Sequence, residues 1–239
     1  MPEAPRFWAV VPAAGRGVRM GGEVPKQYLP LAGRTVIEHT LDRFLSHARI
    51  AGVMVALNAE DEYWPRYQPR NASKPVRLAQ GGAQRSHSVL NALNCLHDEL
   101  QTDDWVLVHD AVRPCLHAED LDKLIRTLEH DPVGGVLAAP LADTVKRVGD
   151  DGIVQSTPDR QKLWRAFTPQ MFRYGLLLDA LRAALDSGRA PTDEAAAVEA
   201  AQLGRVRVVE GRSDNIKITR ASDLALAEAI LRSQMRSTA

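Results

Sequence analysis

Short apolar runs rich in β-branched residues alternate along the chain with segments whose apolar residues recur at helical spacing. Such runs are typical of strands buried on both faces, and helical spacing is typical of amphipathic helices. The first helical segment opens with a capping box, in which Glu38 follows Thr35 by three positions. In the first part of the chain we expect strands at 7–11, 52–57, 76–79, 105–109 and 135–139, and helices at 35–47, 86–100 and 118–130.

This alternation of strands and helices predicts an α/β fold with a mostly parallel sheet and helices on both faces. Ligands of such sheets bind beyond the carboxyl ends of the strands, which is where functional residues are expected. A chain of 239 residues can bury a sizeable core, and no repeat or linker divides it. We therefore expect a single domain over residues 1–239.

The pattern changes after Pro140. Segments 144–148 and 153–156 flank the sequence Gly149-Asp150-Asp151-Gly152, which is typical of a β-hairpin turn. Because this hairpin contains few core-forming residues, we expect an arm over 141–162 that projects from the main body. Beyond the arm we expect strands at 163–167, 206–210 and 215–218, and helices at 174–187, after Thr192 and from about Ser222.

Composition excludes several classes of function. Lys plus Arg and Asp plus Glu are equal at 30 each, so no overall field favours nucleic acid or an anionic membrane as a partner. The only cysteines, Cys95 and Cys115, lie far apart and form no C-x-x-C pattern, which argues against zinc or a disulfide framework. The apolar runs are too short for a membrane span or a signal peptide, so we expect a cytoplasmic protein.

The segment Pro12-Ala13-Ala14-Gly15-Arg16-Gly17-Val18-Arg19-Met20 directly follows the first expected strand. Small residues and glycines let backbone amides approach a bulky ligand and form an anion-binding nest. The spacing matches neither the Walker A pattern nor the dinucleotide fingerprint, because Met20 occupies the last glycine position. Arg19 and Lys26 add cations nearby. The segment is therefore either a phosphate-binding loop or a flexible glycine loop with solvated cations.

Several motifs together carry a resemblance to a known family. The chain resembles the 2-C-methyl-D-erythritol 4-phosphate cytidylyltransferases of the non-mevalonate isoprenoid pathway, with the motifs in the family's order over nearly its whole length. The matching blocks are P-A-A-G-x-G-x-R-M from Pro12, P-K-Q-Y from Pro25, G-G-x-x-R-x-x-S-V from Gly81, V-H-D-A-V-R-P from Val108, D-T-V-K from Asp143, F-T-P-Q from Phe167, T-D-E-A from Thr192 and E-G-R-x-D-N-I-K from Glu210.

The resemblance implies a Rossmann-like fold of the nucleotide-diphospho-sugar transferase type and transfer of CMP from CTP to 2-C-methyl-D-erythritol 4-phosphate. The products would be 4-diphosphocytidyl-2-C-methyl-D-erythritol and pyrophosphate. Mg²⁺ would bind mainly through the CTP phosphates, without dedicated metal ligands from the protein. Arg19 and Lys26 would stabilise the phosphates in the transition state. The remaining nucleotide-binding residues would be Pro12, Ala13, Ala14, Gly15, Gly17, Gly82 and Ser88.

For the second substrate, the resemblance implies that Lys217 and Arg160 bind the incoming polyol phosphate. It also implies a homodimer, whose sites are completed by Thr144 and Arg160 of the partner subunit. Asp110, Arg113 and Thr192 would hold the polyol. Other readings remain open for two of these residues, because Asp110 could instead cap a helix or pair with Arg113, and Thr192 could cap the helix that follows it.

One position departs from the family's pattern, and rival functions stay open. Many relatives have an acidic residue after the double glycine, where this chain has Ala83. A side-chain contact to the base from that position is therefore missing, and we expect cytosine to be recognised through backbone and steric fit. The nearest rival is a cytidylyltransferase acting on ribitol 5-phosphate, and a non-catalytic nucleotide-binding module is a more distant one.

Overall fold

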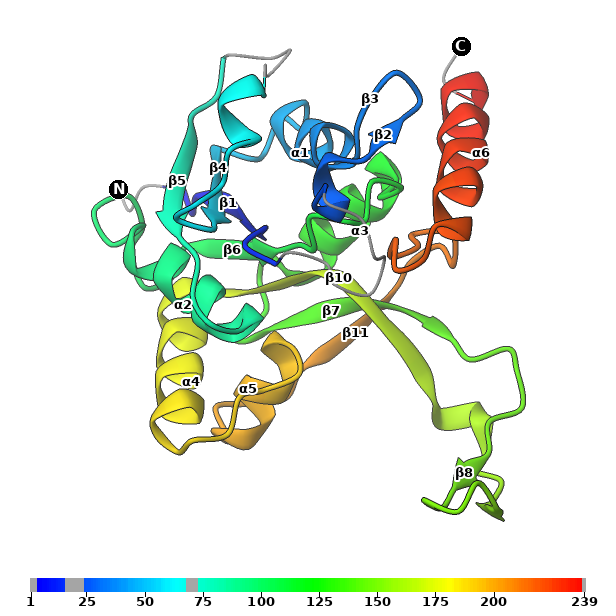
Figure 1. The fold of residues 1–239 in the computed structure, drawn as a ribbon. Coiled ribbons are helices and arrows are strands. Elements are labelled where there is room, and N and C mark those ends of the chain that lie inside the picture. Colours follow the sequence, from blue (N-terminus) through cyan, green and yellow to red (C-terminus); the bar gives the residue numbers. More distant parts are fainter. Residues whose placement is uncertain (1–3, 16–23, 68–72, 238–239) are drawn as a thin grey trace.

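The computed structural model describes residues 4–15, 24–67 and 73–237. Its centre is a seven-stranded sheet in the order β11-β7-β10-β6-β1-β4-β5 (Figure 1). Parallel pairs join β1 to β4 and β6, β4 to β5, and β7 to β11, whereas β10 is antiparallel to β6 and β7. These observations confirm the predicted mostly parallel α/β sheet. The strands are β1 (Phe7–Pro12), β4 (Gly52–Leu57), β5 (Val76–Gln80), β6 (Trp105–Val108), β7 (Gly134–Pro140), β10 (Trp164–Arg173) and β11 (Arg207–Glu210).

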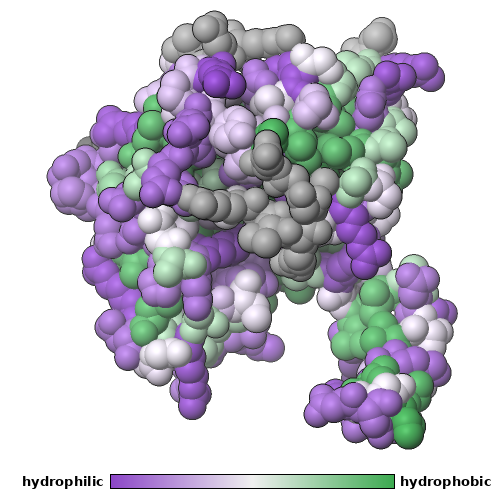
Figure 2. All heavy atoms as spheres, viewed as in Figure 1, coloured by the Kyte–Doolittle hydropathy of each residue, from purple (hydrophilic) through white to green (hydrophobic). Residues whose placement is uncertain are grey.

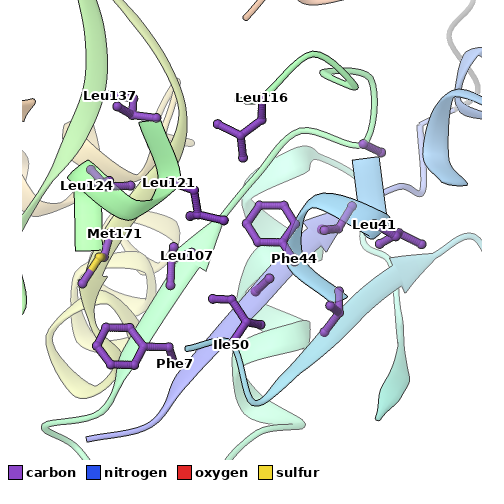
Figure 3. Close-up of a cluster of buried hydrophobic side chains, with 14 of the residues drawn as sticks. Phe7, Leu41, Phe44, Ile50, Leu107, Leu116, Leu121, Leu124, Leu137 and Met171 are labelled. Atoms are coloured by element: carbon purple, nitrogen blue, oxygen red, sulfur yellow. The ribbon is translucent and has the colours of Figure 1, made fainter. Parts of the chain in front are cut away.

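Helices cover both faces of the sheet. The helices are α1 (Val36–Leu45), α2 (Arg85–Asn94), α3 (Ala118–Leu128), α4 (Tyr174–Asp186), α5 (Glu194–Ala200) and α6 (Ser222–Ser237). Side chains alternate across β1, so Ala9 packs in a core with α1 and α3, while Val10 packs in a second core with α2 and α4. Figure 3 shows part of the first core, where Phe44 of α1 and Leu121 of α3 approach the sheet from the same side. Among the described residues, no helix is both long and apolar enough to cross a bilayer.

Local sequence signals explain where some elements begin and end. Thr35 and Glu38 form the predicted capping box at the start of α1. The helix expected at 86–100 is shorter in the structure. It ends at Asn94 of α2, and turns follow it. Leu96 and Leu100 are nevertheless buried in the core of the α2 face, which explains their helix-like spacing. Asp193, not Thr192, is the N-cap of α5, because its side chain accepts from the amide of Ala196.

The prediction of a strand at 215–218 is wrong, because these residues form a loop. Its apolar residues alternate as in a strand, but the backbone makes isolated contacts rather than a ladder. The amide of Ile218 donates to the carbonyl of Val112 at 2.9 Å, and the amide of Ile216 donates to that of Asp214 at 2.7 Å. Ile218 is buried in a small core beneath α6, which fixes the loop by packing.

The predicted hairpin is present and projects from the main body (Figure 1). It consists of β8 (Arg147–Val148) and β9 (Val154–Ser156), which pair only with each other, followed by the short 3₁₀ helix η4 (Arg160–Lys162). Val148, Ile153 and Val154 are exposed there, and hydrophobic residues are visible on the surface of this arm (Figure 2). We call residues 141–162 the arm.

Candidate active site

A cavity of about 590 Å³ lies at the carboxyl ends of β1, β4, β5 and β6. The loops after these parallel strands converge because the strands end at the same edge of the sheet. Further residues reach the cavity from the short 3₁₀ helix η2 (Lys26–Tyr28) and from the loop before α6. The predicted site residues that line it are Pro12, Ala13, Ala14, Gly15, Lys26, Gly82, Ser88, Asp110 and Lys217.

Hydrogen bonds fix the loop after β1 against its neighbours. The amide of Ala13 donates to the carbonyl of Ala56 at 2.8 Å, and the buried side chain of Gln27 donates to the carbonyl of Ala13 at 2.8 Å. The amide of Gly81 donates to the carbonyl of Leu57 at 2.6 Å. A Cβ atom on Gly81 would lie 2.2 Å from that of Ala14, so only glycine allows this close approach. These contacts hold the two glycine-containing loops on the same wall of the cavity.

Ser88 has a structural role in the cavity wall. Its hydroxyl accepts from the amide of Gly82 at 3.0 Å and donates to the carbonyl of Gln84 at 3.2 Å. The residue is buried, so this hydroxyl orients the backbone of the double glycine. A cytosine contact from Ser88 stays a prediction, and it would have to use the remaining lone pair of the hydroxyl.

Asp110 lies at the centre of a cluster of charged side chains. Its Oδ1 accepts from Arg85 Nε at 3.0 Å, while its Oδ2 lies 3.3 Å from Arg113 Nε and 2.9 Å from Lys217 Nζ. The ion pair with Arg113, open as an alternative from the sequence, is therefore present. Asp110 does not start a helix, so the capping alternative is wrong. The side chain of Asp110 is 8% exposed, whereas that of Lys217 is 42% exposed and reaches the open cavity.

The cluster favours an ionised Asp110 at all physiological pH values. Burial by itself raises the pKa of this carboxyl, but the positive charges of Arg85, Lys217 and Arg113 outweigh it and lower the pKa well below its ordinary value. Asp110 is therefore an acceptor of hydrogen bonds and not a proton donor. A group of this kind can hold substrate hydroxyls or cations, but it cannot act as a general acid.

A chain of hydrogen bonds beneath Asp110 fixes its backbone. The Asp110 amide donates to Thr168 Oγ1 at 3.1 Å, and this hydroxyl contacts His109 Nδ1 at 3.0 Å. His109 Nε2 faces the carbonyl of Arg113 at 3.0 Å; since a carbonyl only accepts, Nε2 carries the proton and Nδ1 accepts from Thr168. Burial lowers the pKa of His109 to about 4, so the ring is neutral. His109 is thus a structural residue, as its lack of a nucleophile partner indicates.

The same network fixes the loop that carries Lys217. Asn215 is buried and donates from its side chain to the carbonyl of Thr168 at 2.8 Å. Arg113 Nη1 donates to the carbonyl of Asn215 at 2.7 Å. Lys217 lies between the main cavity and a neighbouring one of about 300 Å³, which Arg113 and Arg165 also line. Arg113 and Lys217, each predicted separately to bind the acceptor substrate, are therefore brought together beside Asp110.

Four predicted site residues are described but do not line the main cavity, and two others, Gly17 and Arg19, lie outside the described residues. Arg113 lines the neighbouring cavity beside Lys217. Thr144 and Arg160 are on the arm, where Arg160 donates from Nη1 to the carbonyl of Ala142. Thr192 lines a separate pocket of about 320 Å³ beside β7 and β11. For these residues, contact with a substrate stays a prediction.

Sequence reasoning left two residues of the charged cluster without a role. Arg85 donates from Nη1 and Nη2 to the two oxygens of Glu194, at 2.6 Å and 3.1 Å, in addition to its bond with Asp110. Both residues belong to blocks that match the family, G-G-x-x-R and T-D-E-A. Their pairing joins residues 109 positions apart, and nothing local in the sequence indicates it.

The donor set argues against a metal held by protein side chains. In the part of the chain that the structure describes, no group of three or more His, Cys, Asp or Glu side chains could hold an ion. Asp110 is the only carboxylate that lines the main cavity within that part, and it already contacts Arg85, Arg113 and Lys217. The described residues of the cavity therefore form no carboxylate cage of the kind that could hold a magnesium ion by protein side chains alone.

A substitution at Gly15 tests whether a ligand approaches this loop. A Cβ atom at Gly15 meets no atom of the described residues within 4 Å, so Gly15→Ala should leave the melting temperature unchanged. If a nucleotide lies against the loop, the added methyl should raise the KM for CTP on the order of tenfold, or about 1.4 kcal/mol. At Gly82 a Cβ atom would lie 2.4 Å from that of His87, so Gly82→Ala is the matched variant that should lower stability. An unchanged KM for CTP in Gly15→Ala would contradict close approach.

Comparisons with known proteins agree with this geometry. The model of the family described as "IspD: 2-C-methyl-D-erythritol 4-phosphate cytidylyltransferase" matches residues 7–233. A protein of that name from Pseudomonas entomophila is 53% identical over 221 residues, covering 92% of this chain and 93% of its own. A protein of the same name from Hahella chejuensis is 50% identical over 234 residues, covering 98% of this chain and 96% of its own.

Solved structures are similar over the same extent. A crystal structure named 4-diphosphocytidyl-2C-methyl-D-erythritol synthase is 36% identical, covers 95% of this chain and 98% of its own, and has a TM-score of 0.80. The 2-C-methyl-D-erythritol 4-phosphate cytidylyltransferase from Thermus thermophilus is 30% identical, covers 95% of this chain and 99% of its own, and has a TM-score of 0.77. The chain belongs to the 2-C-methyl-D-erythritol 4-phosphate cytidylyltransferase family.

Proposed function

We propose that this enzyme transfers CMP from CTP to 2-C-methyl-D-erythritol 4-phosphate, giving 4-diphosphocytidyl-2-C-methyl-D-erythritol and pyrophosphate in isoprenoid precursor biosynthesis. Family membership supports the activity. The observation that carries the proposal is the position of Lys217 beside Asp110, in a cavity that Lys26 of η2 also lines. Two lysines from separate segments that line one cavity are suited to bringing two phosphates together.

On the nucleotide side, the backbone around Gly15 and Gly82 forms the wall on which CTP would lie. Close packing of Gly81 against Ala14 leaves little room there, which favours a pyrimidine over a larger purine. Ala83 lines the cavity and offers no polar side-chain group to the base. Lys26 lies near the expected phosphates, where its ammonium group would offset their charge. Arg19 is proposed for the same task from the sequence motif.

On the acceptor side, Lys217 is proposed to bind the phosphate of the polyol and to direct one of its oxygens at the α-phosphorus of CTP. Asp110 would accept hydrogen bonds from the polyol hydroxyls, since it stays ionised. When the phosphate arrives, Lys217 exchanges its contact with Asp110 for one with the substrate, and an oxygen of Asp110 becomes available. Arg113 would keep the carboxylate oriented during this exchange.

The chemistry requires positioning and charge stabilisation rather than a general base. The second pKa of a phosphate monoester is about 6, so the attacking oxygen is already ionised near neutral pH. Its attack in line with departing pyrophosphate brings anions together, and fixed cations lower that barrier without reorganising. Magnesium, bound mainly through the CTP phosphates, would supply further charge neutralisation when present.

The arm is proposed to form a homodimer and to complete the partner's site with Thr144 and Arg160. Support comes from its exposed apolar residues Val148, Ile153 and Val154, which belong to none of the cores formed by the described residues. Isolated two-stranded hairpins are marginally stable in water, so an arm of this kind gains stability from packing against another surface. We also propose that the enzyme is cytoplasmic.

Pyrophosphate release measured with CTP and each of two polyol phosphates tests the function. We expect turnover with 2-C-methyl-D-erythritol 4-phosphate to exceed that with ribitol 5-phosphate by at least ~10²-fold in kcat/KM, a difference of about 2.7 kcal/mol. ATP, GTP and UTP serve as controls for the nucleotide. A preference for ribitol 5-phosphate would overturn the choice of substrate, and CTP binding without turnover would indicate a binding module.

A further inference from the structure

Arg85 joins two acidic residues that lie on different elements. It is the first residue of α2, and its guanidinium binds both oxygens of Glu194, the first residue of α5, at 2.6 Å and 3.1 Å. Its third nitrogen, Nε, donates to Oδ1 of Asp110 at 3.0 Å. The side chain of Glu194 is 1% exposed and that of Arg85 is 29% exposed. One planar fork therefore fixes the relative positions of α2, α5 and the loop after β6.

The two oxygens of Asp110 have different surroundings because of this arrangement. Arg85 occupies Oδ1, while Arg113 and Lys217 contact Oδ2. Of these cations, Lys217 is the most exposed and the least constrained, since a lysine ammonium is a point charge on a flexible stem. Departure of Lys217 toward an incoming phosphate would expose Oδ2 to a hydroxyl donor. Arg85 holds Oδ1 during this exchange and keeps the carboxylate from rotating.

Charge balance gives Arg85 a second effect. The cluster contains three cations, Arg85, Arg113 and Lys217, and two carboxylates, Asp110 and Glu194, which leaves a surplus of one positive charge. Burial alone lowers the pKa of Arg85, but Glu194 and Asp110 outweigh it and raise the pKa, so the guanidinium stays charged. A permanently charged group at Oδ1 keeps Asp110 ionised even when Lys217 has moved to the substrate.

We propose that Arg85 is a positioning residue for the polyol-phosphate half of the reaction: anchored on Glu194, it holds Asp110 ionised with one oxygen turned toward Lys217 and the substrate hydroxyls. This inference rests on the proposed function of the cavity, and it adds two residues to which that proposal gives no role. It predicts that loss of the Arg85–Glu194 pair raises the KM for the polyol phosphate far more than the KM for CTP. This holds although Arg85 follows the double glycine on the nucleotide side.

The variants must separate positioning from folding. Changing Arg85 alone to an apolar residue leaves the buried Glu194 carboxylate without its partner, and such variants often fail to fold. Replacing both with apolar residues of similar size, as in Arg85→Met with Glu194→Leu, removes the buried pair as a unit and is often tolerated. Arg85→Lys is the conservative variant, because it keeps the positive charge. It should still impair positioning, because one ammonium group cannot bind both carboxylates as the planar guanidinium does. Arg182→Lys, on the exposed face of α4, is the matched control.

Steady-state kinetics and a titration of Asp110 provide the test. In the double variant we expect the KM for the polyol phosphate to rise at least tenfold, with the KM for CTP changed less than threefold. Arg85→Lys should give an intermediate rise, and Arg182→Lys none. The charged groups that face Asp110 are Arg85 from α2, Arg113 from its own loop and Lys217 from the loop before α6, while Lys26 lines the same cavity from η2. Loss of Arg85 should raise the pKa of Asp110, which a titration of its carboxyl carbon followed by ¹³C NMR measures.

The outcome separates this inference from the proposed function. A folded double variant with an unchanged KM for the polyol phosphate and an unchanged pKa of Asp110 would overturn the role of Arg85. If the wild-type enzyme shows no turnover, the proposed function fails, and the inference is then decided by the Asp110 carboxyl titration followed by ¹³C NMR. A higher pKa of Asp110 in the double variant supports the electrostatic role, and an unchanged pKa rejects it.

Discussion

Lys217→Met should lower kcat by at least ~10²-fold, because the substitution removes a charge that the transition state needs while keeping most of the side-chain length. The ammonium group lies 2.9 Å from Asp110 and reaches into the main cavity. Its loss should also raise the KM for the polyol phosphate, whereas the KM for CTP should change little. Steady-state pyrophosphate release with each substrate varied in turn measures both effects.

Two further lysines sharpen this experiment. Lys26→Met should also lower kcat. It should raise the KM for CTP and not that for the polyol phosphate, since Lys26 is proposed to bind the nucleotide in this cavity. Lys123→Met is the matched control, because that lysine is on α3, where it contacts the carbonyl of Glu210 and does not line the cavity. Turnover of Lys217→Met within threefold of the wild type would contradict the assignment.

The second prediction is that two inactive variants restore activity when they are mixed, because each active site contains residues of both subunits. Lys217→Met disables the main body, and Arg160→Ala disables the arm. In a heterodimer of the two, one site contains both changes and the other contains neither, so the second site is active. Co-expression in equal amounts should therefore restore about a quarter of the wild-type activity per subunit, if subunits pair at random and the two sites are equivalent by symmetry.

Deletion of residues 144–156 with a short glycine–serine link complements this experiment. The shortened chain should be a monomer in light scattering and should lose at least ~10²-fold in kcat, because each site then lacks the arm of its partner. Asp150→Ala, at the tip of the hairpin, is the control for a change in the arm that removes no apolar contact. A fully active monomer, or co-expressed variants that stay inactive, would show that each site is complete within its own chain.

The sheet was predictable because burial on both faces leaves a plain signal. Strands such as β1 and β4 are continuous apolar runs, and β1 indeed alternates its side chains between the two cores. The loop at 215–218 instead alternates polar with apolar residues, which is typical of a half-buried strand, but its backbone pairs with no strand in the described part of the chain. Its pattern reflects the packing of Ile216 and Ile218 beneath α6, and hydrophobic pattern alone cannot distinguish such a loop from a strand.

The site was predictable where its chemistry is local. The loop after β1 and the position of Asp110 at the end of β6 follow from the order of strands, and both line the cavity. The contact of Arg85 with Glu194 was not predictable, because it depends on how α2 and α5 pack. The same holds for His109, whose tautomer is fixed by Thr168 and by a backbone carbonyl. Networks of this kind exist only after folding.

The central claim is that one cavity brings the α-phosphorus of CTP to an oxygen of the polyol phosphate between Lys26 and Lys217. A crystal structure with 2-C-methyl-D-erythritol 4-phosphate and a CTP analogue carrying a methylene bridge between its α- and β-phosphorus atoms tests it most directly. We predict an attacking oxygen in line with the bridging carbon, Lys217 within hydrogen-bond distance of the polyol phosphate, and Lys26 at the triphosphate. A nucleotide bound elsewhere, or phosphates that neither lysine contacts, would contradict the claim.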